Sequence, residues 1–437
     1  MSPRETVVVG GGVAGLVIAR RLALAGRAVT VLEASERLGG ALAPQRIAGV
    51  DLDAGAESFA TRDGGVAPLL AELGVGADVV APEPVSAWVQ RPHGGAVPLP
   101  AAGLLGIPSD LRSPEVARAL GGAGARRAQD DELLGPAVGA DAVTLADLVL
   151  ARMGEAVLDI LVEPVVRGVY SRASRELPVD EASPRLRAAF ADHGTLAGAV
   201  RALRADAPAG SLVGGLRGGM FRLAEALVAD CVRLDVRVET GVVVDELALG
   251  AVGFVDPGTG HRTRRTGDVV LAAPRPGAAP GRPVTLVTLV VESADLDGAP
   301  RGSGLLVAPG STVVARALTH PTAKWRWVAE ALPGRHALRL SYDTPPADPM
   351  ETARADASTM FGVELPEPVD ATVRTWARPA ADPHGFAGDR VGEPIAGVGL
   401  ASVVPHAERV AARLLDEGAV RVPHDSLPRE GRGRMDS

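Results

Sequence analysis

The chain opens with a strongly patterned apolar segment. Residues 7–9 form a β-branched apolar run, which is typical of a buried strand of a parallel sheet. Helical spacing of apolar residues follows at 16–25 and ends at Gly26, and a second strand is predicted at 28–32. Strand, helix and strand in this order predict a βαβ unit at the N-terminus.

Apolar runs continue along the rest of the chain. Further strands are predicted at residues 88–91, 97–100, 268–274, 284–291, 313–318, 325–328, 337–342 and 371–376. Helices are predicted at residues 144–153, 157–161, 223–231, 356–361 and 404–415. This mixture predicts an α/β fold, α+β overall, in which the N-terminal unit is one part of a larger assembly.

Three glycines lie between the first strand and the first helix. Gly10, Gly12 and Gly15 form a G-x-G-x-x-G motif, and Glu33 ends the second strand about 20 residues later. The glycines allow a tight turn, close approach of a pyrophosphate and helix packing, while the acid accepts ribose hydroxyls. The sequence therefore predicts a dinucleotide site, and an acid at Glu33 disfavours NADP because it would repel a 2′-phosphate.

The residues after Glu33 indicate which dinucleotide binds. The segments 36–40 (ERLGG) and 53–58 (DAGAES) resemble the FAD-binding start of the amine oxidase and protoporphyrinogen oxidase group of flavoproteins. The alternative interpretation is that Arg37 is a solvated charge and Gly39–Gly40 a simple loop. The resemblance implies FAD as cofactor, bound in this half by Gly10, Gly12, Val13, Ala14, Gly15, Glu33, Ala34, Arg37, Gly39, Gly40, Gly55, Ala56, Glu57 and Ser58.

The C-terminal half resembles the closing motif of the same group. An apolar-Gly-Asp turn at Gly388 and Asp389 precedes a G-x-G at residues 397–399. The resemblance implies that Asp389 accepts a ribityl hydroxyl and that backbone N–H groups at a helix start face the flavin. It assigns to FAD the residues Val243, Ala272, Gly388, Asp389, Gly397, Val398, Gly399 and Leu400. The chain departs from the family in a shortened segment before Gly388 and in Glu393-Pro394, which look inserted.

Sequence motifs in the middle of the chain indicate the class of substrate. Residues 163–170 (EPVVRGVY), 184–186 (PRL) and 193–196 (HGTL) resemble the protoporphyrinogen/coproporphyrinogen III oxidase family. Taken alone, Glu163-Pro164 is interpreted as a helix end and Gly168 as a turn. The resemblance implies six-electron oxidation of a porphyrinogen, with dioxygen as acceptor and hydrogen peroxide as product. Arg62, Arg167 and Arg172 are the candidates to bind its propionates, because arginine pairs with carboxylates in a bidentate manner, although each could equally be a surface charge.

The resemblance implies a domain order. FAD-binding parts are expected at residues 1–85, 208–275 and 385–424, around a helical domain at 86–207 and a β-rich substrate domain at 276–384. Residues 425–437 are expected to be a disordered tail. Hydride loss from the substrate requires no acid–base residue, and we nominate no catalytic residue; none of the eight histidines has a catalytic or metal spacing.

Composition narrows the picture further. A net charge of −8 and 3% aromatic residues argue against nucleic-acid binding, and the single cysteine, Cys231, excludes an internal disulfide or a cysteine metal cluster. No apolar run approaches a membrane span, and the first strand leaves no room for a signal peptide, so we expect a cytoplasmic protein. The arginines of the helical domain suit a peripheral contact with the inner face of the membrane, or a solvated surface.

Several alternatives stay open at this point. One lysine, Lys324, among many arginines suggests a high-GC bacterium, for which coproporphyrinogen III is favoured over protoporphyrinogen IX. A flavin amine oxidase or desaturase would share only the FAD domain, and a degenerate FAD-binding protein is the non-enzymatic hypothesis. A ferrochelatase contact is a hypothesis from the pathway alone, and the oligomeric state stays open.

Overall fold

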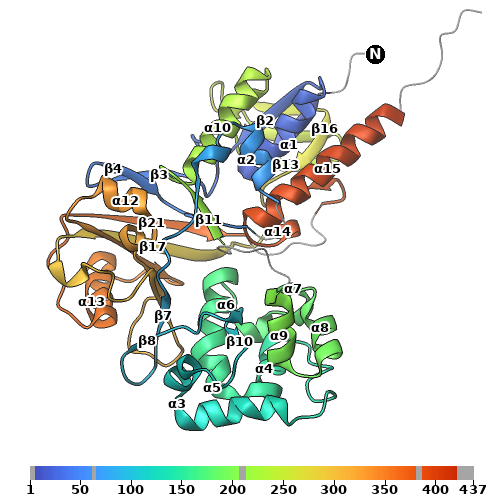
Figure 1. The fold of residues 1–437 in the computed structure, drawn as a ribbon. Helices are drawn as coiled ribbons and strands as arrows, with labels where there is room; N and C mark the ends of the chain where they lie inside the picture. Colours follow the sequence, from blue (N-terminus) through green and yellow to red (C-terminus); the bar gives the residue numbers. More distant parts are fainter. Residues whose placement is uncertain (1–4, 62–64, 206–212, 380–385, 421–437) are drawn as a thin grey trace, which may run out of the picture.

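The computed structural model describes residues 5–61, 65–205, 213–379 and 386–420, with side chains described through residue 417. Arg62 and the expected tail lie outside the described residues. Figure 1 shows three parts: a nucleotide-binding domain with both ends of the chain, a large sheet beside it, and a helical domain below. The predicted α/β class with a mixed-sheet domain and a helical insertion is confirmed.

The nucleotide-binding domain is built on a parallel sheet of five strands in the order β12-β2-β1-β16-β22. The strands are β1 (Thr6–Val9), β2 (Val29–Glu33), β12 (Arg237–Thr240), β16 (Asp268–Leu271) and β22 (Asp389–Arg390). One core contains side chains of α1 (Val13–Leu24), α2 (Ala67–Glu72), α10 (Phe221–Arg233) and α15 (Leu400–Val420). The two ends of the chain therefore share one core.

A second, antiparallel sheet packs on the other face of this domain. Its strands are β13 (Val244–Ala248), β14 (Ala251–Val255) and β15 (Arg262–Thr266). Phe254 and Val252 pack against Val7, Val9 and other apolar side chains of the parallel sheet. The parallel strands are buried on both faces, which explains why all four residues of β1 are buried and three of them are valines.

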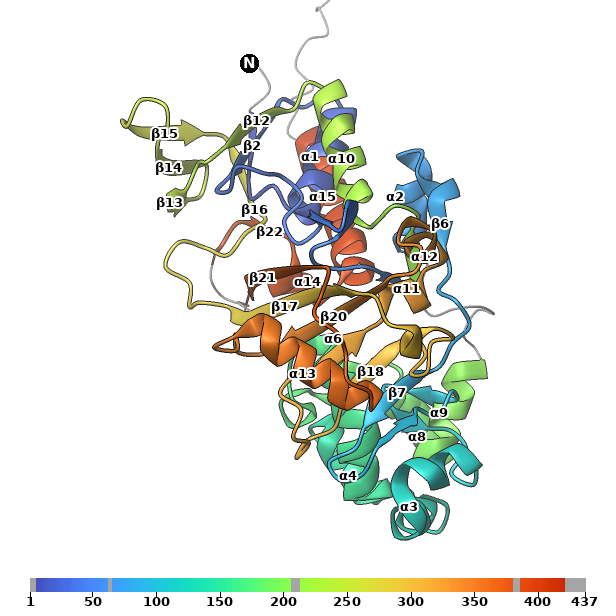
Figure 2. The same ribbon diagram turned by 90° about the vertical axis from the view of Figure 1, so that its left-hand side faces the viewer.

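The large sheet has seven strands in the order β21-β17-β20-β19-β18-β7-β8, and only β18 and β7 pair in parallel. They are β7 (Ala87–Gln90), β8 (Ala96–Pro98), β17 (Arg282–Val291), β18 (Gly304–Val307), β19 (Ala317–Thr319), β20 (His336–Tyr342) and β21 (Asp370–Arg378). Helix α13 (Pro349–Phe361) shares a core with β17 and β20 (Figure 2). Helix α12 (Arg326–Ala331) packs with the hairpin of β3 (Pro44–Ile47) and β4 (Val50–Asp53) (Figure 1). A small sheet of β5 (Phe59–Ala60), β11 (Val213–Leu216) and β6 (Val79–Val80) completes this region.

The helical domain has its own apolar core. Its helices are α3 (Pro114–Gln129), α4 (Leu145–Met153), α5 (Glu155–Val157), a π-helical segment (Leu158–Val162), α6 (Glu163–Tyr170), α7 (Val179–Ala182), α8 (Leu186–His193) and α9 (Leu196–Ala205), after a hairpin of β9 (Gly103–Leu104) and β10 (Ile107–Pro108). Thr144 caps α4 in a reciprocal bond with Asp147, as its sequence position predicts.

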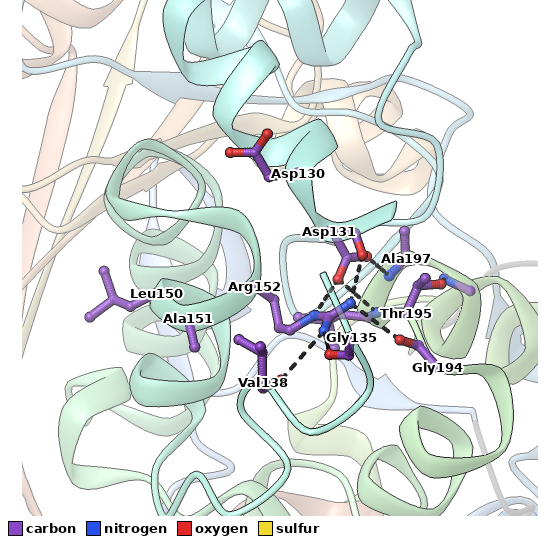
Figure 3. A network of polar contacts seen from close by, with 12 residues as sticks. Asp130, Asp131, Gly135, Val138, Leu150, Ala151, Arg152, Gly194, Thr195 and Ala197 are labelled. Atoms are coloured by element: carbon purple, nitrogen blue, oxygen red, sulfur yellow. Dashed lines mark hydrogen bonds and ion pairs between the residues drawn. The ribbon is translucent and has the colours of Figure 1, made fainter. Parts of the chain in front are cut away.

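A buried ion pair lies inside this domain (Figure 3). The Arg152 and Asp131 side chains are completely buried, with Nε of Arg152 2.6 Å from Oδ1 of Asp131. Asp131 also accepts the backbone N–H groups of Leu196 and Ala197 at the start of α9. Arg152 donates further to the carbonyl oxygens of Gly135 and Gly194, so both charged groups are well satisfied.

Several sequence-based expectations differ from the structure, among them the strand predicted at 313–318, of which only residues 317–318 lie in a strand, β19. The strand predicted at 325–328 is wrong: Trp325, Val328 and Leu332 are buried at helical spacing, and the segment forms α12. The helix end at Glu163 and the turn at Gly168 are also wrong, because helical structure is continuous from Glu155 to Tyr170; α6 begins at Glu163 and includes Gly168. The domain boundary predicted at residue 86 places the hairpin of β7 and β8 in the helical domain. In the structure, β7 pairs with β18 of the large sheet.

The described part of the chain contains no helix with the length and apolar character needed to cross a membrane.

Candidate functional site

The N-terminal glycine turn leaves room for a ligand. Gly10 has a φ of +108°, and a Cβ at Gly15 would lie 1.9 Å from the carbonyl oxygen of Gly10, so neither position tolerates a side chain. A Cβ at Gly12 would meet no described atom within 4 Å. The backbone at Gly12 therefore borders open space at the start of α1, as a pyrophosphate site requires.

Glu33 lies directly beside this turn. Its Oε2 accepts the N–H of Gly11 at 2.7 Å, and its Oε1 accepts the N–H and hydroxyl of Ser35. A carboxylate offers about four acceptor positions, so capacity for a ribose hydroxyl remains. The half-buried Glu33 is thus held in place at the end of β2, where the dinucleotide motif predicts it.

The Arg37 turn packs onto the glycine turn. Gly39 donates its N–H to the Gly11 carbonyl at 2.8 Å, and Gly12 and Gly39 form an isolated parallel bridge. The exposed Arg37 guanidinium donates to the carbonyl oxygens of Leu38, Leu42 and Gly40. Arg37 is therefore not simply a solvated charge, since it holds the shape of the turn that brings Gly39 and Gly40 to Gly12.

The segment after β4 is fixed from both sides. Gly55 lies so close to the Ala41 carbonyl that a Cβ would come within 2.2 Å of that oxygen. On the other side Arg339 of β20 donates to the carbonyl oxygens of Asp53 and Gly55. The exposed Ala56 and half-buried Ser58 flank Glu57 within this segment.

Glu57 points into a buried ionic group. Its carboxylate lies 2.6 Å from Nζ of Lys324 and 2.9 Å from a guanidinium nitrogen of Arg339. Burial alone would raise the pKa of Glu57, but Arg339 and Lys324 outweigh it and hold that pKa below its usual range. The Glu57 side chain is therefore engaged with the large sheet.

Asp53 caps a helix in the same group. Its two carboxylate oxygens accept the N–H groups of Met220 and Phe221 at the start of α10. Burial raises the pKa of Asp53 to about 6, although these two hydrogen bonds and Arg339 oppose the rise. This carboxylate thus supports the fold of the site and couples it to pH.

The C-terminal motif returns to the same edge of the parallel sheet. Asp389 pairs with Val270 as β22 joins β16, and its carboxylate is bonded to Arg413 of α15. A Cβ at Gly388 would clash with the ring of Phe386. Helix α14 (Glu393–Ala396) follows, and Gly397 and Gly399 adopt φ values of +87° and +89° before α15 begins at Leu400. The N–H of Gly399 bonds to Oε1 of Glu393 at 3.2 Å.

The C-terminal segment comes close to the N-terminal glycine turn at Gly392. A Cβ built on Gly392 would lie 3.8 Å from the Cβ of Ala14, in α1, and equally close to the carbonyl oxygen of Ala272, at the end of β16. Val13 and Ala14 are buried, whereas Ala34 and Val243 are exposed beside Glu33, whose carbonyl accepts the N–H of Val242. The segment between Asp389 and Gly397 therefore packs against the start of α1, next to the N-terminal glycine turn.

Of the arginines proposed to bind the substrate, Arg167 and Arg172 have different partners in the structure. Arg62 lies outside the described residues. Arg167 lies 2.6 Å from Asp343 and lines a cavity of about 270 Å³ between α6 and the β18–β19 connection. Arg172 is bonded to Glu181 and to the Glu176 carbonyl within the helical domain.

Sequence reasoning missed the charged residues of the large sheet. Arg339 and Lys324 anchor the 53–57 segment, and Arg316 and Arg378 gather around Ser171. The single lysine beside Trp325 was a usable signal, because an isolated residue type in a buried segment needs a partner. The arginines offered no such signal among so many others.

The chain is similar to known proteins over most of its length. Residues 13–305 match the family model described as flavin containing amine oxidoreductase. A protein named coproporphyrinogen III oxidase from Mycobacterium tuberculosis (strain ATCC 25618 / H37Rv) is 34% identical over 408 residues, covering 86% of each chain. A protein of the same name from Staphylococcus aureus is 23% identical, covering 79% of each.

Solved structures share the fold. A putative protoporphyrinogen oxidase from Exiguobacterium sp. 255-15 superposes with a TM-score of 0.78 at 22% identity, over 95% of this chain and all of the other. Putrescine oxidase bound to putrescine gives a TM-score of 0.62 at 17% identity, over 95% and 99%.

These similarities confirm the predicted cofactor, FAD, and the predicted flavoprotein fold. The described glycine turns and Glu33 fit that cofactor on their own geometry. The chain therefore belongs to the flavin containing amine oxidoreductase family and is a relative of the coproporphyrinogen III oxidases.

Proposed function

We propose that this protein oxidises coproporphyrinogen III to coproporphyrin III, with FAD as cofactor and dioxygen as acceptor. The reaction removes six electrons and six protons from the macrocycle and reduces three molecules of dioxygen to hydrogen peroxide. The observation that carries the proposal is the 34% identity to coproporphyrinogen III oxidases across both nucleotide-binding ends and the middle of the chain. Protoporphyrinogen IX is the alternative substrate.

The residues assigned to FAD are part of this proposal. When bound, FAD supplies the two-electron oxidation and passes the electrons to dioxygen. Gly12 and the start of α1 would bind the pyrophosphate, and Glu33 would accept the adenosine ribose hydroxyls. The start of α15 would place backbone N–H groups at the flavin end of the site.

An amine substrate is disfavoured by the charge of the junction between domains. Arg167, Arg316 and Arg378 gather there, and a protonated polyamine would be repelled by them. A substrate that carries carboxylates is complementary to the same groups.

The test is direct. The purified protein should show a flavin absorption spectrum, and porphyrin fluorescence should grow when coproporphyrinogen III is added under air, with hydrogen peroxide accumulating at three equivalents. Putrescine serves as the control substrate and should give no peroxide. Growth with protoporphyrinogen IX alone would transfer the proposal to that substrate, and growth with neither would refute it.

The cellular setting belongs to the same proposal. A cytoplasmic location, a peripheral contact of the helical domain with the membrane, and a contact with ferrochelatase as consumer of the product are proposed on the resemblance. Fractionation of cells into soluble and membrane pools, with and without high salt, tests the membrane contact.

A further inference from the structure

A cationic group lies where the three parts of the molecule meet. Ser171 follows α6 of the helical domain, and its Oγ accepts a hydrogen bond from NH1 of Arg316 at 3.1 Å and from NH1 of Arg378 at 2.7 Å. Arg316 directly precedes β19, and Arg378 ends β21, both in the large sheet. We call Ser171, Arg316 and Arg378 the junction triad.

Within the part of the chain that the structure describes, the arginines of the junction outnumber the acids that face them. Arg167, Arg316 and Arg378 share Asp343, which contacts Arg167 and Arg316, and Glu393, which lies 3.8 Å from Arg378. Arg282 also reaches the Ser171 carbonyl, but it pairs with Glu176. The junction therefore has room for one more negative charge.

Arg316 has unused hydrogen-bonding capacity. Its side chain is 90% buried, and its Nε has no hydrogen-bond partner among the described residues. Burial lowers the pKa of Arg316, and Arg378 and Arg167 lower it further, while Asp343 opposes them. A buried guanidinium with a free N–H is costly unless an acceptor arrives.

Ser171 adds a third donor. Both lone pairs of its Oγ are taken by the two arginines, so its proton is available for an acceptor. Ser171 has a φ of +52°, a left-handed conformation that glycine would adopt at lower cost. A serine at this position gains a contact through its hydroxyl that glycine would lack.

Neighbouring residues hold Ser171 in place. Glu163 accepts the N–H and the hydroxyl of Ser174, and Tyr170 donates its hydroxyl to the Ala182 carbonyl. Tyr170 directly precedes Ser171 in the chain, and Ser174 follows it three residues later. The turn is therefore braced within the helical domain.

The triad lies between two cavities. Arg316 and Arg167 line the cavity of about 270 Å³. The chain neighbours of Arg378 and Glu393, Pro379 and Pro394, line another of about 430 Å³. Glu393 in turn accepts the N–H of Gly399 just before α15, so two contacts through Glu393 link the triad to the predicted flavin end of the FAD site.

We propose that the junction triad binds a carboxylate side chain of the substrate, which the NH groups of Arg316 and the hydroxyl of Ser171 hold. This assignment rests on the proposed function, because it makes the ligand a propionate of the porphyrinogen. The alternative, a group that only braces the domains, does not account for the unpartnered Nε of Arg316 or the excess of arginines.

Binding of the stable product tests the proposal without turnover. FAD-loaded protein is titrated with coproporphyrin III and, in the same detergent, with its tetramethyl ester, which has the same size and no carboxylates; porphyrin fluorescence reports binding. The variants are Arg316→Gln, Arg316→Lys and Ser171→Ala. Arg335→Gln is the matched control, since Arg335 pairs with Glu292 at the opposite end of β17 and β20.

The expected pattern is specific to the carboxylate. Arg316→Gln should weaken coproporphyrin III binding roughly tenfold or more, and Ser171→Ala about threefold, with the ester unaffected and Arg316→Lys intermediate. Melting temperature and FAD content verify that each variant is folded.

Two results would overturn the proposal. If the wild type oxidises porphyrinogen but the variants bind both porphyrins as the wild type does, the triad assignment fails and the proposed function stands. If the variants weaken acid and ester equally, the triad only braces the domains. A wild type that binds neither porphyrin and oxidises no porphyrinogen would refute the proposed function itself.

Discussion

Arg152 and Arg316 are both buried arginines beside an aspartate, yet their surroundings differ. Arg152 pairs with one aspartate, which also caps α9, and its remaining donors meet carbonyl oxygens of the same domain. Arg316 shares its aspartate with Arg167, has an unpartnered Nε among the described groups, and lines a cavity. A closed network indicates a structural role, and an open one with surplus charge indicates a ligand.

The largest expected change in stability is for the replacement of Asp131, the acid of the closed Arg152 network. Asp131→Ala leaves Arg152 buried without its anion and α9 without its cap, so the free energy of unfolding should fall by roughly 3–5 kcal/mol. Urea unfolding followed by circular dichroism measures it. Arg335→Gln removes an exposed pair and should cost less than about 1 kcal/mol. A similarly small loss of unfolding free energy in Asp131→Ala would contradict a structural role for the Arg152–Asp131 pair.

Asp53 lies between the closed and the open network in character: it is buried and hydrogen-bonded, but burial raises its pKa to about 6. This exceeds its unfolded value of 3.8, so the folded protein takes up a proton as pH falls from 6 towards 4. The group therefore adds stability as pH falls, up to roughly 3 kcal/mol, and this is lost as pH rises through 6. Unfolding free energies from pH 4 to 7 should show this slope in the wild type, and Asp53→Asn should flatten it. Equal slopes would contradict the assignment.

Gly12 separates ligand contacts from folding contacts in the nucleotide-binding domain. Gly12→Ala meets no described atom, so the unliganded protein should keep its melting temperature, while FAD affinity falls by about 10- to 100-fold as the methyl group enters the cofactor space. Gly15→Ala is the contrasting variant, because its Cβ collides with the Gly10 carbonyl and should lower stability even without FAD. Flavin fluorescence quenching and thermal unfolding measure the two effects. Unchanged FAD affinity in Gly12→Ala would place the cofactor elsewhere.

Asp343 belongs to the open network around Arg316, and its replacement is expected to have the smallest effect of these variants. Asp343→Asn removes the acid shared by Arg167 and Arg316, so coproporphyrin III should bind about two- to fivefold more tightly at low salt. The gain should shrink in high salt, because Asp343 is partly exposed. Weaker binding would mean that Asp343 positions the arginines rather than competing with the ligand.

Local patterns predicted the nucleotide-binding domain well. The strand at Val7–Val9, the glycine turn and the helix that ends before Gly26 follow from local backbone preferences and periodicity, and all are present. The strand predicted at 325–328 failed because a short apolar run cannot distinguish a strand from a buried helix.

The motifs that resembled the porphyrinogen oxidases have structural contacts that the sequence did not reveal. Glu163 supports the turn after α6, and the 193–196 segment supplies Gly194 and Leu196 to the Arg152–Asp131 network. The similarity identified the family, but in the structure Glu163, Gly194 and Leu196 stabilise the helical domain next to the junction triad.

The sequence by itself predicted a dinucleotide site in the N-terminal βαβ unit, because its turn, its helix start and its strand-terminal acid are encoded within a few tens of residues. Only the tertiary structure decided which charges meet. Arg316 and Arg378 of the large sheet lie 145 and 207 positions along the chain from Ser171, which belongs to the helical domain. No local preference relates residues so far apart, and their common position results from the packing of a sheet against a helical domain.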